Sequence, residues 1–373
     1  MVNKYGDKKL EKKIMSKPIV TISVPAFKRA DMIEDLIKSY LVQTYENSEL
    51  LIVDDCVTDC EVEILVKKYQ LVDSRIRFIK NKSNMGYCKN FLKTLIEARG
   101  EYIIILGDDD IFLKEEAVAK YVEIFEKYPD VGFVHTNTMQ FNENCKMDYA
   151  YKTFRKDILY QTLEESLENI WLKSIHIAGI GLRKDKRFEE LYPKSYMLFP
   201  QVELIGKLLG TCKSFGIAEF LVGVRAHSAQ LGFYAAKGQR IKKQEKFGPV
   251  EMYQIIETLV KYYKFDLGIE SDVDTKLLYG KLIEFFTQIL PTEKINSGNL
   301  AVSKTFFDSI RMRTPFSSNA YYFLYFIMAI CFPRNVLFSL KEWRKRQIMM
   351  RHFEKERINF NKFIMKAGII YNE

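Results

Sequence analysis

The stretch EYIIILGDDD, residues 101–110, carries the pattern that decides the fold. A run of apolar, largely β-branched residues is typical of a buried strand. The run ends abruptly in Asp108, Asp109 and Asp110. Adjacent carboxylates repel one another, and a divalent cation with oxygen ligands offsets that repulsion. The sequence therefore predicts a strand that delivers a metal site to a sheet edge. The alternative is an acidic turn whose Asp110 caps the next helix.

The segments before this stretch alternate between strand and helix patterns. Strands are predicted at 19–27, 48–56 and 75–80, and helices at 31–43, 61–70 and 87–98. Apolar strands that alternate with helices predict a parallel sheet covered on both faces, with ligands outside the carboxyl ends of its strands. Pro25, Asp54 and Asp55 fall at that edge together with the three aspartates, and Asn84 and Gly86 supply a turn beside it.

Four motifs in order carry a resemblance to a known family. VTISVPAFKR, LIVDDC, NKSNMGYCKN and ARGEYIIILGDDD, within residues 19–141, resemble the nucleotide-sugar-binding half of glycosyltransferase family 2. The resemblance implies an α/β domain with the Rossmann-like GT-A fold, a mostly parallel sheet covered by helices. It also implies inverting transfer of a hexose-type sugar (EC 2.4) from a nucleotide-diphosphate sugar, with a UDP-sugar preferred. The acceptor would be a saccharide or a lipid-linked saccharide in bacterial surface-polysaccharide synthesis.

The resemblance also suggests roles for single residues. Phe27 or the backbone near Pro25 would contact the base, Asp55 the ring nitrogen of the base, Asp108 the ribose and Asp109 the metal. Further candidates for nucleotide-sugar binding are Arg29, Asn84, Gly86 and Asn90. Asp110 is a second candidate metal ligand. Gly107 stands where many relatives have the first aspartate of the aspartate-any-aspartate (DXD) motif, which leaves the division of roles among the three carboxylates open.

The chemistry of such a site favours Mn²⁺ or Mg²⁺ as cofactor. Negative charge develops on the leaving diphosphate, and a divalent cation held by carboxylates neutralises it as a Lewis acid. Both ions suit oxygen ligands and keep positions for diphosphate oxygens. The six cysteines form no CxxC pair and the four histidines lie far apart, so a zinc site is not expected.

Residues 142–248 are predicted to hold the acceptor. By resemblance, the catalytic base should be an aspartate that opens a helix, but that position is Gln201, and glutamine takes no proton at neutral pH. Glu203 and His176 are the nearest candidates for a replacement base. The alternatives are that Glu203 is a solvated helix residue and that His176 is a hydrogen-bonded core histidine.

The segment FLVGVRAHSAQLGF, residues 220–233, resembles the arginine-x-histidine segment of the family. It implies that Arg225 binds the diphosphate and that His227 serves the metal, followed by a lid containing Gly232, Gly238 and Gly248. The alternative is a surface histidine beside a structural arginine.

The region 249–373 changes to long helical patterns and is basic. Residues 319–332 are nearly all apolar or aromatic, but they are too short to span a bilayer. Ten Lys or Arg against three Glu follow in residues 334–366, giving +7 of the formal net charge of +9. This composition predicts peripheral attachment to an anionic membrane. The alternative is a core helix followed by a solvated one. Nucleic acid is not an expected partner, because the basic excess is confined to the tail and no nucleic-acid motif occurs.

The sequence also predicts a cytoplasmic enzyme, whose closest association with the cell membrane would be peripheral attachment to its inner face. Residues 1–17 form a charged extension without the apolar core of a signal peptide. Residues 18–248 are predicted to form the GT-A domain, with a nucleotide-sugar half at 18–141. Two other functions remain open. A nucleotidyltransferase should carry a glycine-rich loop, which PAFKRAD lacks, whereas a non-catalytic nucleotide-sugar-binding protein is consistent with Gln201.

Overall fold

The computed structural model of the chain describes residues 19–192 without 143 and 152, residues 199–226, 249–269, 320–333 and 353–369, and short stretches between 277 and 343. The predicted N-terminal extension, His227 and the glycine-containing lid lie outside the described residues. The short stretches described between 277 and 343 are residues 277–281, 283–284, 299, 302–303, 306, 335–337, 339–340 and 343.

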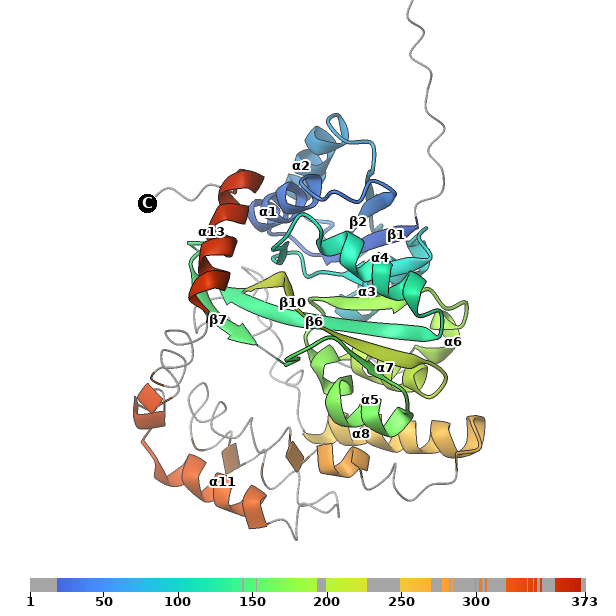
Figure 1. Cartoon of the computed structure of the whole chain (residues 1–373), viewed down its shortest axis with the longest axis vertical. Coiled ribbons are helices and arrows are strands. Elements are labelled where there is room, and N and C mark those ends of the chain that lie inside the picture. The colour runs from blue at the N-terminus through green and yellow to red at the C-terminus, as the bar shows by residue number, and fades with distance from the viewer. Residues whose placement is uncertain are drawn as a thin grey trace, which may run out of the picture.

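The described residues build one ten-stranded sheet with the order β3-β2-β1-β4-β9-β6-β10-β5, in which β7 pairs with β6 and β8 with β10 (Figure 1). The strands are β1 (Val20–Ala26), β2 (Ser48–Asp54), β3 (Ile76–Lys80), β4 (Tyr102–Ile105), β5 (Ile111–Phe112), β6 (Val131–Phe141), β7 (Met147–Tyr151), β8 (Ile158–Tyr160), β9 (Ile180–Arg183) and β10 (Lys213–Arg225).

The first four strands in this order are parallel, as the sequence predicts. β1 pairs in parallel with β2 and β4, β2 with β3, and β6 with β10. The antiparallel strand β9 lies between β4 and β6. Because β9 comes from the predicted acceptor half, the two predicted halves share a single sheet.

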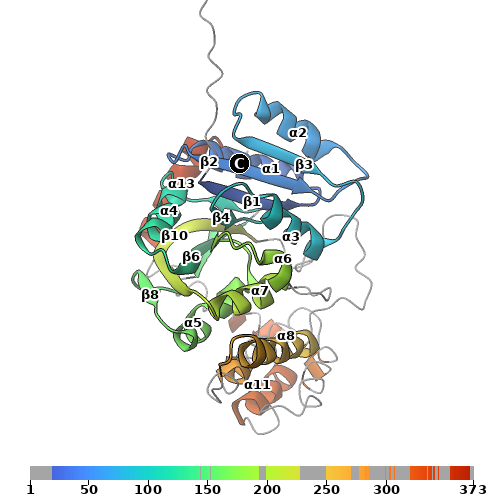
Figure 2. The same ribbon diagram turned by 90° about the vertical axis from the view of Figure 1, so that its right-hand side faces the viewer.

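Helices cover both faces of the sheet (Figure 2). The helices of the described residues are α1 (Ala30–Leu41), α2 (Glu61–Gln70), α3 (Tyr87–Glu97), α4 (Ala117–Lys127), α5 (Leu163–Asn169), α6 (Phe188–Leu191), α7 (Pro200–Leu209), α8 (Pro249–Lys261), α11 (Ala320–Cys331) and α13 (Glu354–Ala367), with a short 3₁₀-helix η1 (Trp171–Ile175) and a short π-helix η2 (Tyr262–Asp266). The predicted helix at 61–70 is observed with the same bounds.

Each face of the sheet has its own hydrophobic core. Alternation along β4 explains the division, since Ile104 points into one core and Ile103 and Ile105 into the other. The first core includes buried residues of α1, α2, α4 and α13, and the second includes those of α3, α5, α7 and α8. The mixed α/β architecture with its mostly parallel central strands is therefore the predicted one.

The C-terminal helix α13 packs against the first core. Its apolar side chains Phe360, Phe363 and Ile364 are buried there, and the ring of Phe360 lies 5.7 Å from that of Phe141 in β6. Lys366 forms an ion pair with Glu115. The apolar stripe of this helix is therefore used inside the protein, which agrees with the alternative of a packed helix, while membrane contact of the basic tail stays a prediction.

None of the helices in the described parts of the chain combines the length and the hydrophobicity needed to cross a bilayer.

Candidate functional site

Four strands end at one edge of the sheet and bring the motif residues together. The amide of Asp55 donates to the carbonyl of Ala26 (2.9 Å), and the amide of Asn81 donates to the carbonyl of Asp54 (2.9 Å). The amide of Leu106 donates to the carbonyl of Ser23 (3.2 Å). These bonds extend the parallel ladder past the ends of β1, β2, β3 and β4, so the loops that follow these strands lie side by side.

Arg29 holds two of the three aspartates in the turn after β4. Its Nη1 lies 2.9 Å from Asp108 Oδ1 and 2.9 Å from Asp109 Oδ2. Asp108 Oδ2 also accepts a hydrogen bond from the amide of Phe27 (3.1 Å). The repulsion between neighbouring carboxylates is thus offset by a guanidinium of the same chain.

Asp110 stabilises its own turn. Its Oδ2 accepts from the amide of Gly107 (2.7 Å). The alternative that Asp110 caps the next helix is wrong, because β5 begins at Ile111 and the N-cap of α4 is Glu116. A carboxylate engaged with the backbone of its own turn is less suited to ligate a metal than Asp108 or Asp109.

Burial raises the pKa values of two carboxyl groups in this cluster. The pKa of Asp108 is raised to about 7, because burial and the charge of Asp109 together outweigh the opposing effect of Arg29. Burial and then Asp109 raise the pKa of Asp110 well above its usual range. The cluster therefore favours any cation that reaches it.

Gly107 is required by the close packing of the turn. A Cβ at this position would lie 2.7 Å from Asp110 Oδ2 and 2.9 Å from Asp109 Oδ1. The aspartate that many relatives carry here would therefore displace the carboxylates of this chain.

Asp55 organises the neighbouring turn. Its Oδ1 accepts from Asn81 Nδ2 and from the amide of Met85, and its Oδ2 accepts from the amide of Gly86, each at 2.8 Å. Gly86 has a φ of 78°, which a residue without a side chain adopts at little cost. Asn84 Oδ1 accepts from the same Gly86 amide at 3.0 Å. The predicted residues Asp55, Asn84 and Gly86 thus form one structural unit.

Asn90 and Asn81 lie beneath this unit and hold the strand ends together. Asn90 Nδ2 donates to the carbonyls of Val53 (3.0 Å) and Ala26 (3.3 Å), and Asn90 Oδ1 accepts from Asn81 Nδ2 (2.9 Å). These bonds give Asn90 a supporting position below the edge. The sequence analysis did not name Asn81, although a polar residue directly after β3, at the edge that contains Asp55, could have indicated it.

The start of α7 joins the nucleotide-side loops to the acceptor side. Gln201 is the second residue of α7, as predicted, and is buried. Its Nε2 donates to the carbonyl of Ile175 (3.0 Å), and its Oε1 accepts from the hydroxyl of Tyr87 (3.4 Å). Tyr87, which the sequence analysis did not single out, follows Gly86 and so links the Asp55 turn to α7.

The structure separates the two candidate bases. Glu203 is buried and its Oε1 lies 2.7 Å from Lys207 Nζ, so it is not the solvated residue of the alternative interpretation. His176 follows Ile175 and is exposed, so it is not a core histidine, but desolvation and then the charge of Lys173 lower the pKa of its ring. An ion-paired carboxylate is a poorer proton acceptor than an accessible imidazole, and His176 directly follows Ile175, whose carbonyl binds Gln201.

The side chain of Arg225 is buried and forms an ion pair inside the protein. Its Nη2 lies 2.7 Å from Asp35 Oδ2 in α1, and its guanidinium lies 4.7 Å from the ring centre of Phe141. Its Nε donates to the backbone carbonyl of Asp109 (3.3 Å). This is the structural arginine of the alternative interpretation, and a direct diphosphate contact would require it to leave a buried ion pair.

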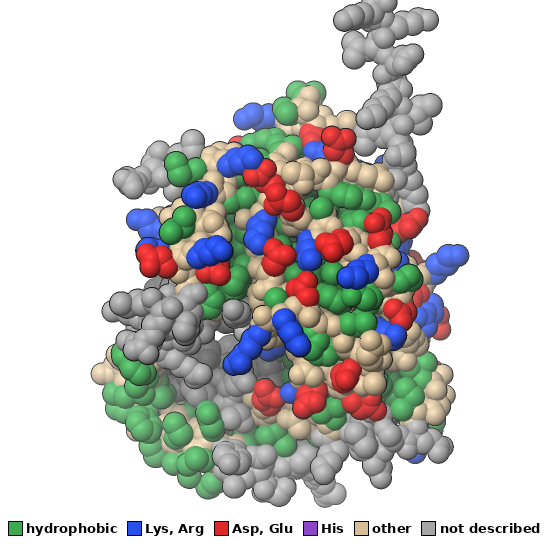
Figure 3. Space-filling view, in the orientation of Figure 1, with side chains coloured by type: hydrophobic (Ala, Val, Ile, Leu, Met, Phe, Trp, Pro, Cys, Tyr) green, Lys and Arg blue, Asp and Glu red, His purple; other side chains and the backbone are tan. Residues whose placement is uncertain are grey.

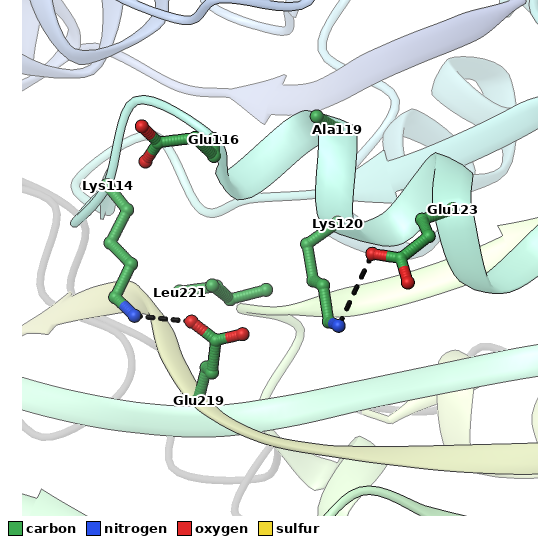
Figure 4. A pocket seen from close by; sticks show the side chains of 7 residues that line it. All are labelled: Lys114, Glu116, Ala119, Lys120, Glu123, Glu219 and Leu221. Carbon is green, nitrogen blue, oxygen red and sulfur yellow. Dashed lines mark hydrogen bonds and ion pairs between the residues drawn. The ribbon is translucent and has the colours of Figure 1, made fainter.

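A hollow of about 480 Å³ lies elsewhere, between α4 and β10 (Figure 4). Its walls carry Lys114 and Lys120, whose ammonium groups pair with Glu219 and Glu123. Neither Asp55 nor any aspartate of the turn after β4 lines it. Both of its lysines are already ion-paired within the hollow, so the strand edge is the better candidate site.

The aspartates fit a divalent cation. Asp108 and Asp109 converge on one point, the Nη1 of Arg29, and two carboxylates plus diphosphate oxygens are a suitable ligand set for Mg²⁺ or Mn²⁺. Within the described residues, no group of three or more His, Cys, Asp or Glu side chains is arranged as a metal site. A cation bound here would therefore be held by the two carboxylates together with oxygens of a bound diphosphate.

The chain is similar in sequence to known glycosyltransferases. Residues 21–187 match the family model described as "Glycosyl transferase family 2". The chain is 38% identical over 149 residues to the "Putative colanic acid biosynthesis glycosyl transferase WcaA" of Escherichia coli, covering 37% of this chain and 53% of that protein. It is 36% identical over 100 residues to the "Putative teichuronic acid biosynthesis glycosyltransferase TuaG" of Bacillus subtilis, covering 27% of this chain and 39% of that protein. The chain thus spans about half or less of the length of these relatives.

Among solved structures, that of Staphylococcus aureus TarS 1–349 in complex with UDP-GlcNAc is similar, with a TM-score of 0.58 and 15% identity over 87% of this chain and 91% of that one. At this identity the likeness establishes the fold and confirms the predicted GT-A architecture.

Proposed function

Since residues 21–187 place this chain in glycosyltransferase family 2, we propose that it transfers a sugar from a nucleotide-diphosphate sugar to a saccharide or lipid-linked acceptor. The observation that carries the proposal is the convergence of Asp55, Asp108 and Asp109 at the carboxyl edge of the parallel strands. Ligands of open α/β sheets bind at this edge. A UDP-sugar is the donor we favour, because the similar TarS structure is a complex with UDP-GlcNAc.

In this proposal Asp55 and the backbone near Phe27 hold the nucleoside. Each oxygen of a carboxylate accepts two hydrogen bonds, and Asp55 Oδ2 is given one, from Gly86, so a base N–H can be accommodated. Asp108 lies on the ribose side, and Asp109 with Asp108 would hold Mn²⁺ or Mg²⁺. The cation would supply Lewis-acid stabilisation of the leaving diphosphate.

His176 is the base we favour for the acceptor hydroxyl. It is exposed beside Ile175, whose carbonyl binds Gln201, whereas Glu203 is neutralised by Lys207. Gln201 would orient the acceptor through its amide without taking a proton. Attack from the side opposite the diphosphate inverts the anomeric carbon.

A non-catalytic nucleotide-sugar-binding protein is the second candidate, because Gln201 occupies the expected base position and Glu203 is ion-paired. Release of UDP from UDP-GlcNAc and other UDP-sugars, in the presence of saccharide acceptors, separates the two. Binding without turnover across the panel would favour the second candidate.

Titration calorimetry with UDP tests the donor site. We expect Mn²⁺ to strengthen binding, and Asp109→Asn to remove that gain while leaving the fold intact. Asp130→Asn is the matched control, because Asp130 pairs with Lys213 on the surface. Equal UDP affinity with and without Mn²⁺ in the wild-type protein would rule out the metal role of Asp109.

We also propose that the chain acts at an anionic membrane in surface-polysaccharide synthesis, since the names of TuaG and WcaA refer to teichuronic acid and colanic acid biosynthesis. The support lies in α11 and the residues that follow it. Phe323 and Leu324 are 55% and 50% exposed, and Trp343 is 62% exposed. Figure 3 shows hydrophobic side chains gathered over α11 at the lower left. Exposed aromatic and aliphatic side chains beside a basic segment are typical of interfacial attachment.

A further inference from the structure

The guanidinium of Arg29 occupies the one point on which two carboxylates converge. Asp108 Oδ1 and Asp109 Oδ2 both lie 2.9 Å from the same atom, Nη1. The side chains of Arg29 and Asp109 are only 22% and 17% exposed. A cation that takes both carboxylates must come to the position that this nitrogen holds.

The backbone before α1 places Arg29 there at a cost. Lys28 and Arg29 both have left-handed backbone angles, with φ of 64° and 62°. Such angles are unfavourable for residues with side chains and persist where surrounding contacts hold them. The contacts are the ion pairs of Arg29, the bond from the Phe27 amide to Asp108, and the Arg29 carbonyl, which accepts the amide of Ile33 at the start of α1 (3.0 Å).

The surroundings of Arg29 are acidic. Asp108, Asp109 and Asp110 all act on its charge. Removing the guanidinium would leave these carboxylates without the cation that offsets their repulsion.

We propose that Arg29 is an internal counter-cation that competes with the divalent metal for Asp108 and Asp109. Metal binding and the double ion pair of Arg29 exclude each other, so Arg29 lowers the affinity for metal in the absence of donor and keeps the aspartates in place. Tight metal binding then requires a ligand, such as the diphosphate of the donor, that supplies further oxygen atoms to the metal. This inference rests on the proposed function only in assuming that these two aspartates hold the metal.

The test is a Mn²⁺ titration without nucleotide, followed by the electron paramagnetic resonance signal of free Mn²⁺. We expect Arg29→Gln to bind Mn²⁺ about tenfold more tightly than the wild-type protein, the scale usual for coupled binding events. Arg187→Gln is the matched control, because Arg187 forms a comparable ion pair with Asp185 away from the site. Its Mn²⁺ affinity should equal that of the wild-type protein.

Thermal unfolding gives a second readout. Mn²⁺ should raise the melting temperature of Arg29→Gln more than that of the wild-type protein, because ligands of the folded state stabilise it by mass action. If Arg29→Gln does not fold without metal, Arg29→Lys is the second variant. It keeps the charge, but its ammonium ends one bond short of the Nη1 position that contacts both carboxylates, so it should bind Mn²⁺ more tightly than wild type.

Equal or weaker Mn²⁺ affinity in Arg29→Gln, or in Arg29→Lys where the first variant does not fold, would overturn the inference, as would the absence of Mn²⁺ binding by all variants. These outcomes are separate from failure of the proposed function. A wild-type protein that lacks sugar transfer, but whose Arg29→Gln variant gains Mn²⁺ affinity, would overturn the function and keep the inference.

Discussion

At the scale of single residues, the partner of each buried charge decides what that residue can do. Glu203 is paired with Lys207 and Arg225 with Asp35, so both are held in the fold. Asp54 differs, because its Oδ1 accepts from the amide of Cys56 while its buried Oδ2 has no hydrogen-bond partner. Burial raises the pKa of Asp54 to about 6 from 3.8.

The shifted Asp54 predicts a specific pH dependence of stability. Between pH 3.8 and about 6 the folded protein holds a proton on Asp54 that the unfolded chain has lost, so the free energy of unfolding falls as the pH rises. Asp54→Asn keeps the acceptor for Cys56 and removes this titration. Its melting temperature should fall less than that of the wild-type protein across this range, and parallel profiles would contradict the role of Asp54.

Gly107 gives a second prediction at this scale. Gly107→Ala should weaken Mn²⁺-dependent UDP binding, because the added Cβ meets the carboxylates of Asp109 and Asp110. Gly280→Ala is the matched control, since a Cβ there meets nothing within 4 Å. UDP affinity measured by calorimetry should fall only in the first variant, and a loss of equal size in both would contradict the steric argument.

Single substitutions also test which residue is the catalytic base. His176→Gln should lower the turnover rate by about two to four orders of magnitude, the scale of a lost general base, with donor affinity retained. Glu203→Gln keeps the shape of the side chain and, in this assignment, should have a much smaller effect on turnover. The reverse order of effects would return the role to Glu203.

At the scale of elements, helix α13 completes the first core from the far end of the sequence. Phe360 is 1% exposed, whereas Ile358 on the same helix is 47% exposed. Substitutions at Phe360 and Ile358 therefore give a matched test of whether this helix is part of the folded domain.

Phe360→Ala should reduce the free energy of unfolding by about 3–5 kcal/mol, the usual cost of removing a buried aromatic ring. Ile358→Ala should change it by less than about 0.5 kcal/mol, as expected of an exposed position. Chemical denaturation measures both. If both variants lowered the free energy of unfolding by a similarly small amount, α13 would not be part of the core.

At the scale of the whole molecule, the structure assigns the two ends of the predicted membrane region to different environments. α13 packs against the core, while α11 buries Tyr322 and Ala329 and exposes its other side. Membrane contact, if it is made by this region, therefore falls to α11 and the residues that follow it.

Replacing Phe323 and Ile327 together by serine should reduce cosedimentation with phosphatidylglycerol vesicles, because both side chains are exposed on α11. Serine at Ile64 and Leu71, which are 68% and 90% exposed on and just after α2, is the matched control and should sediment as the wild-type protein does. Equal sedimentation with phosphatidylcholine vesicles, or none with either, would contradict the proposal.

The sequence by itself determined the α/β class, the strand edge and the residues gathered there. Local patterns suffice for this, because a buried parallel strand must be continuously apolar and the polar residues that follow it must lie at the edge. The positions of Asp55, Asp108 and Asp109 follow from the strands that end just before them.

Only the tertiary structure decided which partner each of these residues meets. Arg29 reaches Asp108 and Asp109 from 79 and 80 positions away, and Arg225 meets Asp35 across 190 positions. The insertion of β9 into the sheet and the packing of α13 on the first core are likewise long-range events. Side-chain pairing across such separations depends on distances that no local pattern of residues encodes, because they are set by how the sheet and helices pack together.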